Sequence, residues 1–210
     1  MTYAGIDIAA RDAGLIVMGA LDNDIGTLVL LGTGSAFWPV FSASVEFHDG
    51  QHDPVDRWSR RIVGRLAQQM QADALYPFGN PPYKPFIKWA KQSGRAFSGP
   101  TGMLVHDTVG MMISYRGALQ FAETFPFPDP AHSNPCPSCT GQPCATACPV
   151  GALSDAHSYQ VDKCHAYLDT DAGQRCMTRG CAARRVCPIN QQAPRDPAQS
   201  ALHMKAFHQP

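Results

Sequence analysis

The chain has 210 residues, a length that suits one or two domains. Its 17 Lys and Arg residues balance its 17 Asp and Glu residues, so the charge gives no reason to expect a nucleic-acid or membrane partner. Hydrophobic residues make up 44 % of the chain, which is enough for a core and excludes wholesale disorder. The longest apolar stretch, Gly14 to Leu21, is too short to span a bilayer, and the first residues show no basic-then-apolar export signal. We therefore expect a cytoplasmic protein.

Regular patterns in the first half predict a mixture of helices and strands. In chain order, the expected elements are a helix over Ile6–Ala13, a strand hairpin of Leu15–Leu21 and Thr27–Leu31, a long helix from Pro54 to Met70, a short helix over Phe86–Gln92, and strands at Gly102–Val105 and Met111–Leu119. This order lacks a repeating βα rhythm, so it predicts an α+β layer and not a doubly wound sheet.

Cysteine is distributed very unevenly along the chain. All eight cysteines lie between Cys136 and Cys187, and the first 135 residues contain none. Such a density is typical of disulfide scaffolds or metal sites. Because a reducing compartment is expected, metal ligation is the better interpretation. The proline-rich stretch Pro126–Pro137 is the expected linker. It divides the chain into an α+β domain over 1–128, a cysteine-rich domain over 129–190 and a C-terminal tail over 191–210 that is either laid on the surface or disordered.

The cysteines form two groups, each of which ends in Cys-Pro. The first runs Cys136-x2-Cys139-x4-Cys144-x3-Cys148-Pro, and the second runs Cys176-x4-Cys181-x5-Cys187-Pro, with Cys164 between them. Closely spaced cysteines followed by a Cys-Pro end are the ligand pattern of bacterial ferredoxins, in which the last cysteine binds the other cluster. The pattern predicts two [4Fe–4S] clusters with crossed ligation. The first would take Cys136, Cys139, Cys144 and Cys187, and the second would take Cys148, Cys164, Cys176 and Cys181.

Two structural zinc sites would also use eight cysteines. Zinc modules favour paired Cys-x2-Cys hooks, and only Cys136 and Cys139 form one here. The spacings also depart from the ferredoxin pattern, because four residues instead of two precede Cys144. Iron–sulfur clusters are therefore the prediction, and zinc is the alternative.

Several stretches resemble a known family. The run Cys148-Pro-Val-Gly-Ala-Leu, the run Lys163-Cys164-His-Ala-Tyr-Leu-Asp and the second cysteine group resemble the dicluster domain of epoxyqueuosine reductases. The stretch from Ser98 to Leu119 is similar to the cobalamin-binding domain that those enzymes share with cobalamin decyanases. The resemblance implies a flavin-reductase-like antiparallel sheet domain followed by a small ferredoxin-like domain. It also implies that Cys164 serves the second cluster.

The resemblance and the glycine-rich and aromatic loops suggest a cofactor pocket in the first half. The candidate contacts are Gly34, Phe37, Phe78, Gly102, His106 and Tyr115. A dinucleotide loop is disfavoured because Phe37 stands where its third glycine would be. For His106 the alternative role is to cap a strand, and for Tyr115-Arg116 it is an edge salt bridge.

One departure from the family bears on function. Epoxyqueuosine reductases carry a catalytic Asp near the place of Pro85-Phe86, but no acidic residue occurs between Asp73 and Asp107. We therefore expect an iron–sulfur electron-transfer protein that acts with a redox partner protein and feeds electrons to a corrinoid held by the first domain. The alternative is a corrinoid- or flavin-dependent reductase, with cobalamin or FMN as its cofactor.

Overall fold

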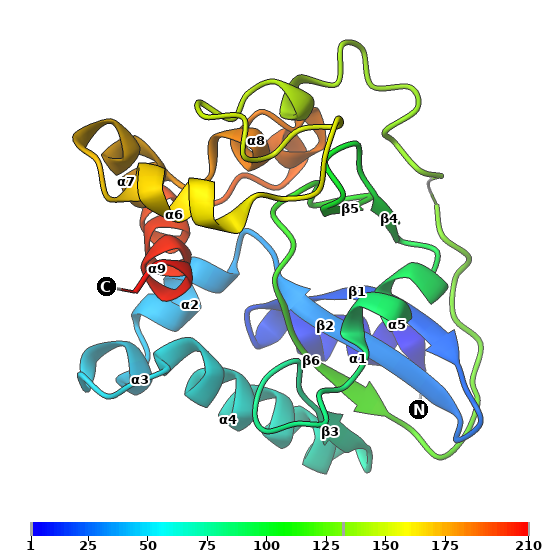
Figure 1. Ribbon diagram of the computed structural model, residues 1–210. Helices are drawn as coiled ribbons and strands as arrows, with labels where there is room; N and C mark the ends of the chain where they lie inside the picture. Colours follow the sequence, from blue (N-terminus) through cyan, green and yellow to red (C-terminus); the bar gives the residue numbers. More distant parts are fainter. Residues whose placement is uncertain (1, 132, 210) are drawn as a thin grey trace. The chain divides into compact units, whose positions relative to one another are not determined.

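A computed structural model describes residues 2–131 and 133–209, without the side chain of Gln192. The chain forms an α+β structure in which an antiparallel four-stranded sheet with helices is followed by a mostly helical, cysteine-rich region (Figure 1). It divides into two compact units. Unit 1 comprises Met1–Ala96 and Ser114–Ser133, and unit 2 comprises Phe97–Ile113 and Asn134–Pro210. These ranges differ from the expected segments 1–128, 129–190 and 191–210, because unit 2 includes residues 97–113 and the C-terminal residues.

The sheet of unit 1 has the strand order β1-β2-β6-β3, and all neighbours are antiparallel. Its strands are β1 (Leu15–Asp22), β2 (Thr27–Thr33), β3 (Asp73–Leu75) and β6 (Tyr115–Gln120). The predicted hairpin of the first two strands is confirmed. Asn23 forms its turn, because its side-chain Oδ1 accepts hydrogen bonds from the amides of Ile25 at 2.9 Å and Gly26 at 3.1 Å. Every residue of β2 is buried, as expected for a central strand.

Five helices accompany this sheet within the described part of unit 1. They are α1 (Tyr3–Asp12), α2 (Phe37–Ser42), α3 (Val45–His48), α4 (Pro54–Met70) and α5 (Phe86–Gln92). The predicted helices at the positions of α1, α4 and α5 are confirmed. In α4 the apolar residues Trp58, Ile62, Val63 and Leu66 are buried, as their three- and four-residue spacing predicts.

Helix α4 packs on β6, and Gly117 allows the close approach. A Cβ atom at Gly117 would lie 2.8 Å from a methyl carbon of Val63. The core beside this contact is aromatic. The Phe37 and Phe41 rings stack at 5.2 Å, and Trp58 meets Phe37 edge-on at 5.1 Å.

Unit 2 is built mainly from short helices joined by loops. Its elements are the two-stranded sheet of β4 (Ala96–Ser98) and β5 (Leu104–His106), the 3-10 turns η1 (Pro143–Ala145), η2 (Asp171–Gly173) and η3 (Pro188–Gln192), and the helices α6 (Val161–Leu168), α7 (Gln174–Arg179), α8 (Ala182–Arg185) and α9 (Pro197–Phe207). The described residues of the predicted linker, 126–131 and 133–137, contain neither helix nor strand, and His132 lies outside the description.

Two stretches differ in part from their sequence predictions. The strand expected over Met111–Leu119 starts only at Tyr115, because the Met111 amide donates to Asn190 Oδ1 at 3.0 Å and is not available to a strand partner. The C-terminal residues, expected to be a surface or disordered tail, form α9, which packs against α7. His208, just after α9, contacts α6 through His165, with 2.6 Å between their Nδ1 atoms.

Across the described residues, none of the helices combines the length and the apolar character needed to cross a bilayer.

Candidate metal centres

Four cysteines line one cavity of unit 2, with a volume of about 380 Å³. They are Cys136, Cys139, Cys144 and Cys187. The chain returns toward the first two through a tight reversal, in which Gly141 and Gln142 adopt left-handed φ angles of 69° and 37°. The Gln142 side chain also donates to the Cys136 carbonyl at 3.2 Å. This reversal accommodates the four-residue spacing before Cys144.

Cys187 joins this cavity from a distant part of the sequence. It caps η3, whose first residue is Pro188, and proline suits this position because its φ angle is already helical. Cys187 and Cys144 are both buried and belong to one hydrophobic cluster with Val105 and Met111. The Cys-Pro end of the second sequence group therefore lies with the thiols of the first group.

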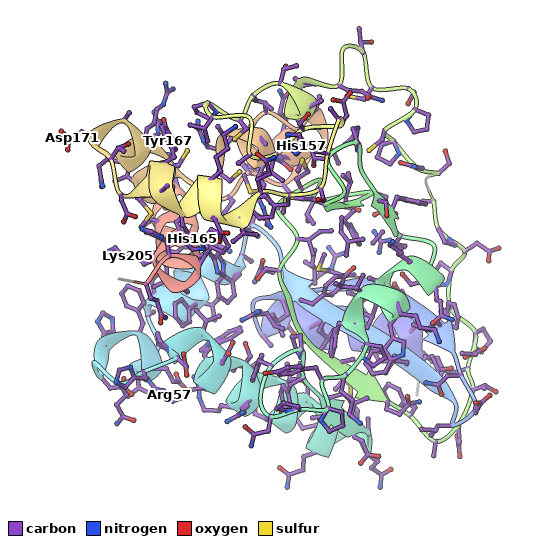
Figure 2. All side chains as sticks on the ribbon, viewed as in Figure 1. Arg57, His157, His165, Tyr167, Asp171 and Lys205 are labelled. Atoms are coloured by element: carbon purple, nitrogen blue, oxygen red, sulfur yellow. The ribbon has the colours of Figure 1, made fainter. Side chains whose placement is uncertain are left out.

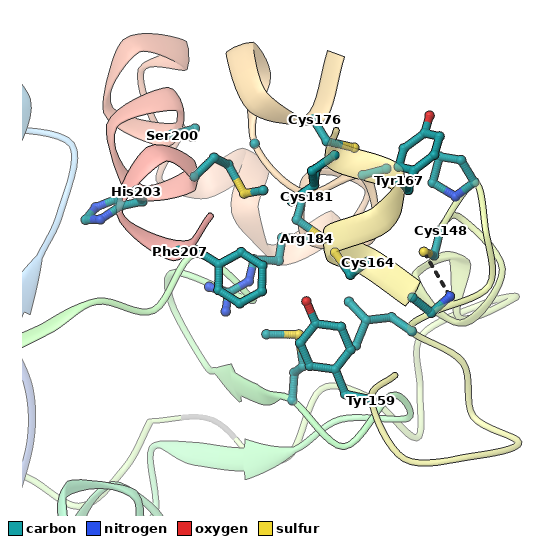
Figure 3. A pocket seen from close by; sticks show the side chains of 18 of the residues that line it. Cys148, Tyr159, Cys164, Tyr167, Cys176, Cys181, Arg184, Ser200, His203 and Phe207 are labelled. Atoms are coloured by element: carbon teal, nitrogen blue, oxygen red, sulfur yellow. Dashed lines mark hydrogen bonds between the residues drawn. The ribbon is translucent and has the colours of Figure 1, made fainter. Parts of the chain in front are cut away.

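The other four cysteines line a second cavity of unit 2, with a volume of about 160 Å³ (Figure 3). They are Cys148, Cys164, Cys176 and Cys181. Cys164 lies on α6, the helix on which Figure 2 labels His165 and Tyr167. Cys176 lies on α7, and Cys181 caps α8. Cys148, the Cys-Pro end of the first sequence group, thus lies with the later thiols.

The pKa values of Cys136, Cys144, Cys164 and Cys176 are raised in part by other thiols of the same quartet. Burial raises the pKa of Cys136, and the thiols of Cys144, Cys187 and Cys139 raise it further. Burial likewise raises the pKa of Cys164, and the thiols of Cys181, Cys148 and Cys176 add to the effect despite an opposing hydrogen bond from Tyr159. Four thiolates in a partly buried cavity repel one another, so a bound cation would relieve the repulsion.

Hydrogen-bond donors point at several sulfurs of the second quartet. The Ala152 amide donates to Cys148 Sγ at 3.2 Å, the dashed line in Figure 3. Hydrogen bonding to the Ala182 amide lowers the pKa of Cys176, and hydrogen bonding to the Tyr159 hydroxyl lowers the pKa of Cys164, against the effect of burial. Burial and this bond to Cys164 raise the pKa of Tyr159, so its hydroxyl keeps its proton at neutral pH. Such donors stabilise thiolate and sulfide charge.

All eight cysteines are unpaired thiols in the structure. Among the residues that the structure describes, no three His, Cys, Asp or Glu side chains are placed as the ligands of one metal ion. The quartets instead surround cavities.

The candidate cofactor contacts do not form one group. In unit 1, Phe37 is fully buried on α2 among Phe41 and Trp58, where a loop above a cofactor was expected. Gly34 lies against Ile16, since a Cβ there would come 2.7 Å from its Cγ2 atom.

Phe78 and Tyr115, also in unit 1, have different neighbours. The guanidinium groups of Arg60 and Arg116 lie 5.4 Å and 5.8 Å from the centroid of the half-buried Phe78 ring. Tyr115 packs near Phe86, with ring centroids 6.3 Å apart. Arg116 forms a 3.1 Å ion pair with Asp56, which agrees with the salt-bridge alternative.

Gly102 and His106 belong to unit 2. Gly102 has a left-handed φ of 76° in the turn before β5, and a Cβ atom added there would meet no heavy atom of the described residues within 4 Å, its chain neighbours aside. His106 ends β5 and is fully buried, where its Nδ1 atom accepts a hydrogen bond from the Thr108 amide at 3.1 Å. This bond holds the turn after the strand, in line with the capping alternative.

Sequence reasoning missed Tyr159 and the residues of α9 that line the second cavity. Ser200, His203 and Phe207 lie there, as Figure 3 shows. Buried polar residues such as Gln199 and Ser200 weaken the apolar pattern of α9, so no periodic signal marks it as a core helix. Tyr159, five residues before Cys164, carries no spacing signal of its own.

No protein-family model matches the chain, and a comparison with curated proteins finds no significant match.

Proposed function

We propose that this protein transfers electrons through two [4Fe–4S] clusters, held by the two cysteine quartets. The observation that supports the proposal is the division of the eight thiols between two cavities. Each cavity combines three cysteines with the Cys-Pro cysteine that ends the other sequence group, Cys187 in one case and Cys148 in the other. This crossing is the arrangement of two-cluster ferredoxins.

The cavities favour clusters over zinc. A zinc ion needs four donors around one point, with Zn–S distances of about 2.3 Å. Each thiolate of a cubane instead binds its own iron, so the ligands surround a volume. Both quartets line cavities, and each cavity contains four thiols and no fifth.

The residues around the thiols suit redox chemistry. When bound, a [4Fe–4S] cluster takes up and releases one electron at a time. Val105, Met111 and Ile189 pack against the first quartet, and Leu168 and Met204 pack against the second. These apolar side chains limit the access of water, which influences the potential of a cluster and protects it from hydrolysis.

A reductase that acts on a corrinoid or flavin is the second candidate function, in the epoxyqueuosine reductase-like and cobalamin decyanase-like group. The observation that favours it is the pair of guanidinium groups beside the half-buried Phe78 ring. Cobalamin and FMN both carry a phosphate, and arginine beside an aromatic face suits such a group. In that case unit 1 would hold the cofactor, and the clusters would supply its electrons.

Anaerobic reconstitution tests the first proposal. We expect about eight irons and about eight sulfides per chain, together with the broad visible absorption of cubane clusters. About four irons, or bound zinc in their place, would refute the two-cluster assignment. The reconstituted protein is then titrated with cobalamin and with FMN separately. A change in the visible bands of either supports the reductase, and unchanged bands with both leave an electron-transfer protein.

A further inference from the structure

The two cavities differ in the charge of the groups around them. Among the described residues that line the first cavity, no side chain other than the thiols is ionisable, and four are prolines. These are Pro100, Pro135, Pro143 and Pro188. Proline has no amide hydrogen, so these positions offer no backbone donor to a cluster. The first cavity therefore has no cationic side chain among its described lining residues.

The second cavity contains two arginines, Arg184 and Arg195. Arg184 lies on α8, three residues after Cys181 and three before Cys187. Its Nη1 atom donates to the Met111 carbonyl at 3.3 Å, which fixes the guanidinium in place. The charges of Cys181 and Arg184 attract each other. Arginine stays protonated in proteins even when buried, so Arg184 is a permanent cation beside this quartet.

Tyr159 adds a hydrogen bond to the same site. Tyr159 and Cys164 line the same cavity, and hydrogen bonding to the Tyr159 hydroxyl lowers the pKa of Cys164. The Tyr159 ring stacks with Phe207 of α9, with centroids 6.4 Å apart and an angle of 19° between the planes. Figure 3 shows Tyr159, Arg184 and Phe207 facing the pocket beside Cys164. The aromatic stack holds the donor toward the sulfur.

We propose that Arg184 and Tyr159 give the second cluster a higher reduction potential than the first, so that the electron rests at the second site. The proposal depends on the proposed function, because both quartets must hold clusters. Reduction adds one negative charge to a cluster, so a buried cation and a donor to its thiolate stabilise the reduced state. Water near the exposed Ser138 and Thr140 also raises the potential of the first cluster, but a buried charge is screened less than one in water.

The electron balance is simple. A low-potential one-electron donor, such as a photoreduced deazaflavin, would give one electron to the chain and would itself be oxidised by one electron. At equilibrium that electron would rest on the second cluster, and the first would stay oxidised. The protein breaks no covalent bond and transfers no proton in this transfer.

The experiment is an anaerobic potentiometric titration of the reconstituted full chain, followed by electron paramagnetic resonance. We expect two reduction waves. Cys164→Ser identifies the wave of the second cluster, because only that wave should move. Arg184→Gln keeps a side-chain donor for Met111 but removes the charge. We expect it to lower the upper wave by at least 59 mV, which is a tenfold loss in the equilibrium constant of a one-electron transfer.

Three further variants provide controls. Arg184→Lys keeps the charge and should retain most of the potential. Arg179→Gln removes an exposed charge of α7 and should leave both waves in place. Tyr159→Phe should lower the same upper wave without the loss of iron, so it tests the proposal even if Arg184→Gln folds poorly.

The outcomes distinguish a failure of the proposed function from a failure of the proposed difference in potential. A chain that binds no iron overturns both the proposed function and this inference. Eight irons with an upper wave that belongs to the first cluster overturn the inference alone. So do eight irons with an upper wave that neither Arg184→Gln nor Tyr159→Phe lowers.

Discussion

Cys144 and Cys187 lie in one buried cluster, whereas Cys148, only four residues after Cys144, lines the other cavity. The short segment between Cys144 and Cys148 therefore connects the two sites. A turn after Cys148, closed by the hydrogen bond from the Gly151 amide to its carbonyl at 3.0 Å, directs the chain toward the second quartet. Neighbours in sequence thus serve different sites, and distant residues serve the same one.

This crossing predicts which cysteine substitutions are redundant. Cys139→Ser should remove the first cluster, which leaves about four irons per chain. The double variant Cys139→Ser/Cys187→Ser should lose no more iron than Cys139→Ser alone, because both residues serve the first site. Cys139→Ser/Cys148→Ser should lose nearly all iron. Iron and sulfide analysis after anaerobic reconstitution measures each case, and the reverse pattern would show uncrossed ligation.

Gly110 lies where a single added methyl group should affect the first cluster site and not the second. Its φ is 56°, and a Cβ atom there would lie 2.3 Å from Asn190 Oδ1 and 2.9 Å from Cys187 Sγ. Asn190 also accepts a hydrogen bond from the amide of Met111, which lines the first cavity. Gly110→Ala should therefore disturb the wall of that cavity. We expect the variant to lose the iron of the first cluster and to keep that of the second, as measured by iron analysis and electron paramagnetic resonance.

Gly102 provides the matched control for Gly110. Its φ of 76° imposes a similar backbone strain on alanine, but nothing lies within 4 Å of the added Cβ. Strain at such positions costs roughly 1 kcal/mol. Gly102→Ala should therefore keep both clusters. Equal iron loss in the two variants would mean that backbone strain, and not contact with Cys187, causes the effect.

The ion pair between Glu46 and Arg61 should make the stability of the protein depend on pH. Arg61 donates two hydrogen bonds to its carboxylate, at 2.5 Å and 2.8 Å, and lowers its pKa from 4.5 to about 2. A lowered pKa in the folded state stabilises the protein above pH 4.5, and this contribution is lost as the pH falls from 4.5 toward 2. Because Arg61 is half exposed, we expect the pair to contribute only about 1–2 kcal/mol at pH 7.

Urea denaturation of the wild type and Glu46→Gln measures this contribution. The variant should be less stable at pH 7, and the difference should shrink steadily below pH 4.5. Asp24→Asn, a change at an exposed carboxylate of the hairpin turn, is the control and should show no such trend. A difference that stays constant between pH 7 and pH 3 would contradict the role of the ionised pair.

Local patterns in the sequence predicted the parts of the structure that local interactions determine. The burial of Trp58, Ile62 and Val63 follows from their helical spacing, and the hairpin follows from apolar runs around Asn23. The inclusion of residues 97–113 in unit 2 depends on long-range bonds, such as that from Met111 to Asn190, which no local pattern indicates. The cysteine groups were visible because their spacing is local, whereas Tyr159 reaches its site only after folding.

Phe37 shows how a residue proposed for a cofactor pocket can serve the core instead. Its ring is fully buried, stacks on Phe41 and meets Trp58 edge-on. Phe37→Ala should therefore lower the free energy of unfolding by about 3–5 kcal/mol, the usual cost of a cavity left by a buried phenyl ring. Chemical denaturation measures this loss, with Val45→Ala on the exposed side of the neighbouring helix α3 as a control that should change little. If Phe37→Ala kept its stability but changed the visible bands of bound FMN or cobalamin, Phe37 would be a cofactor contact and not a core residue.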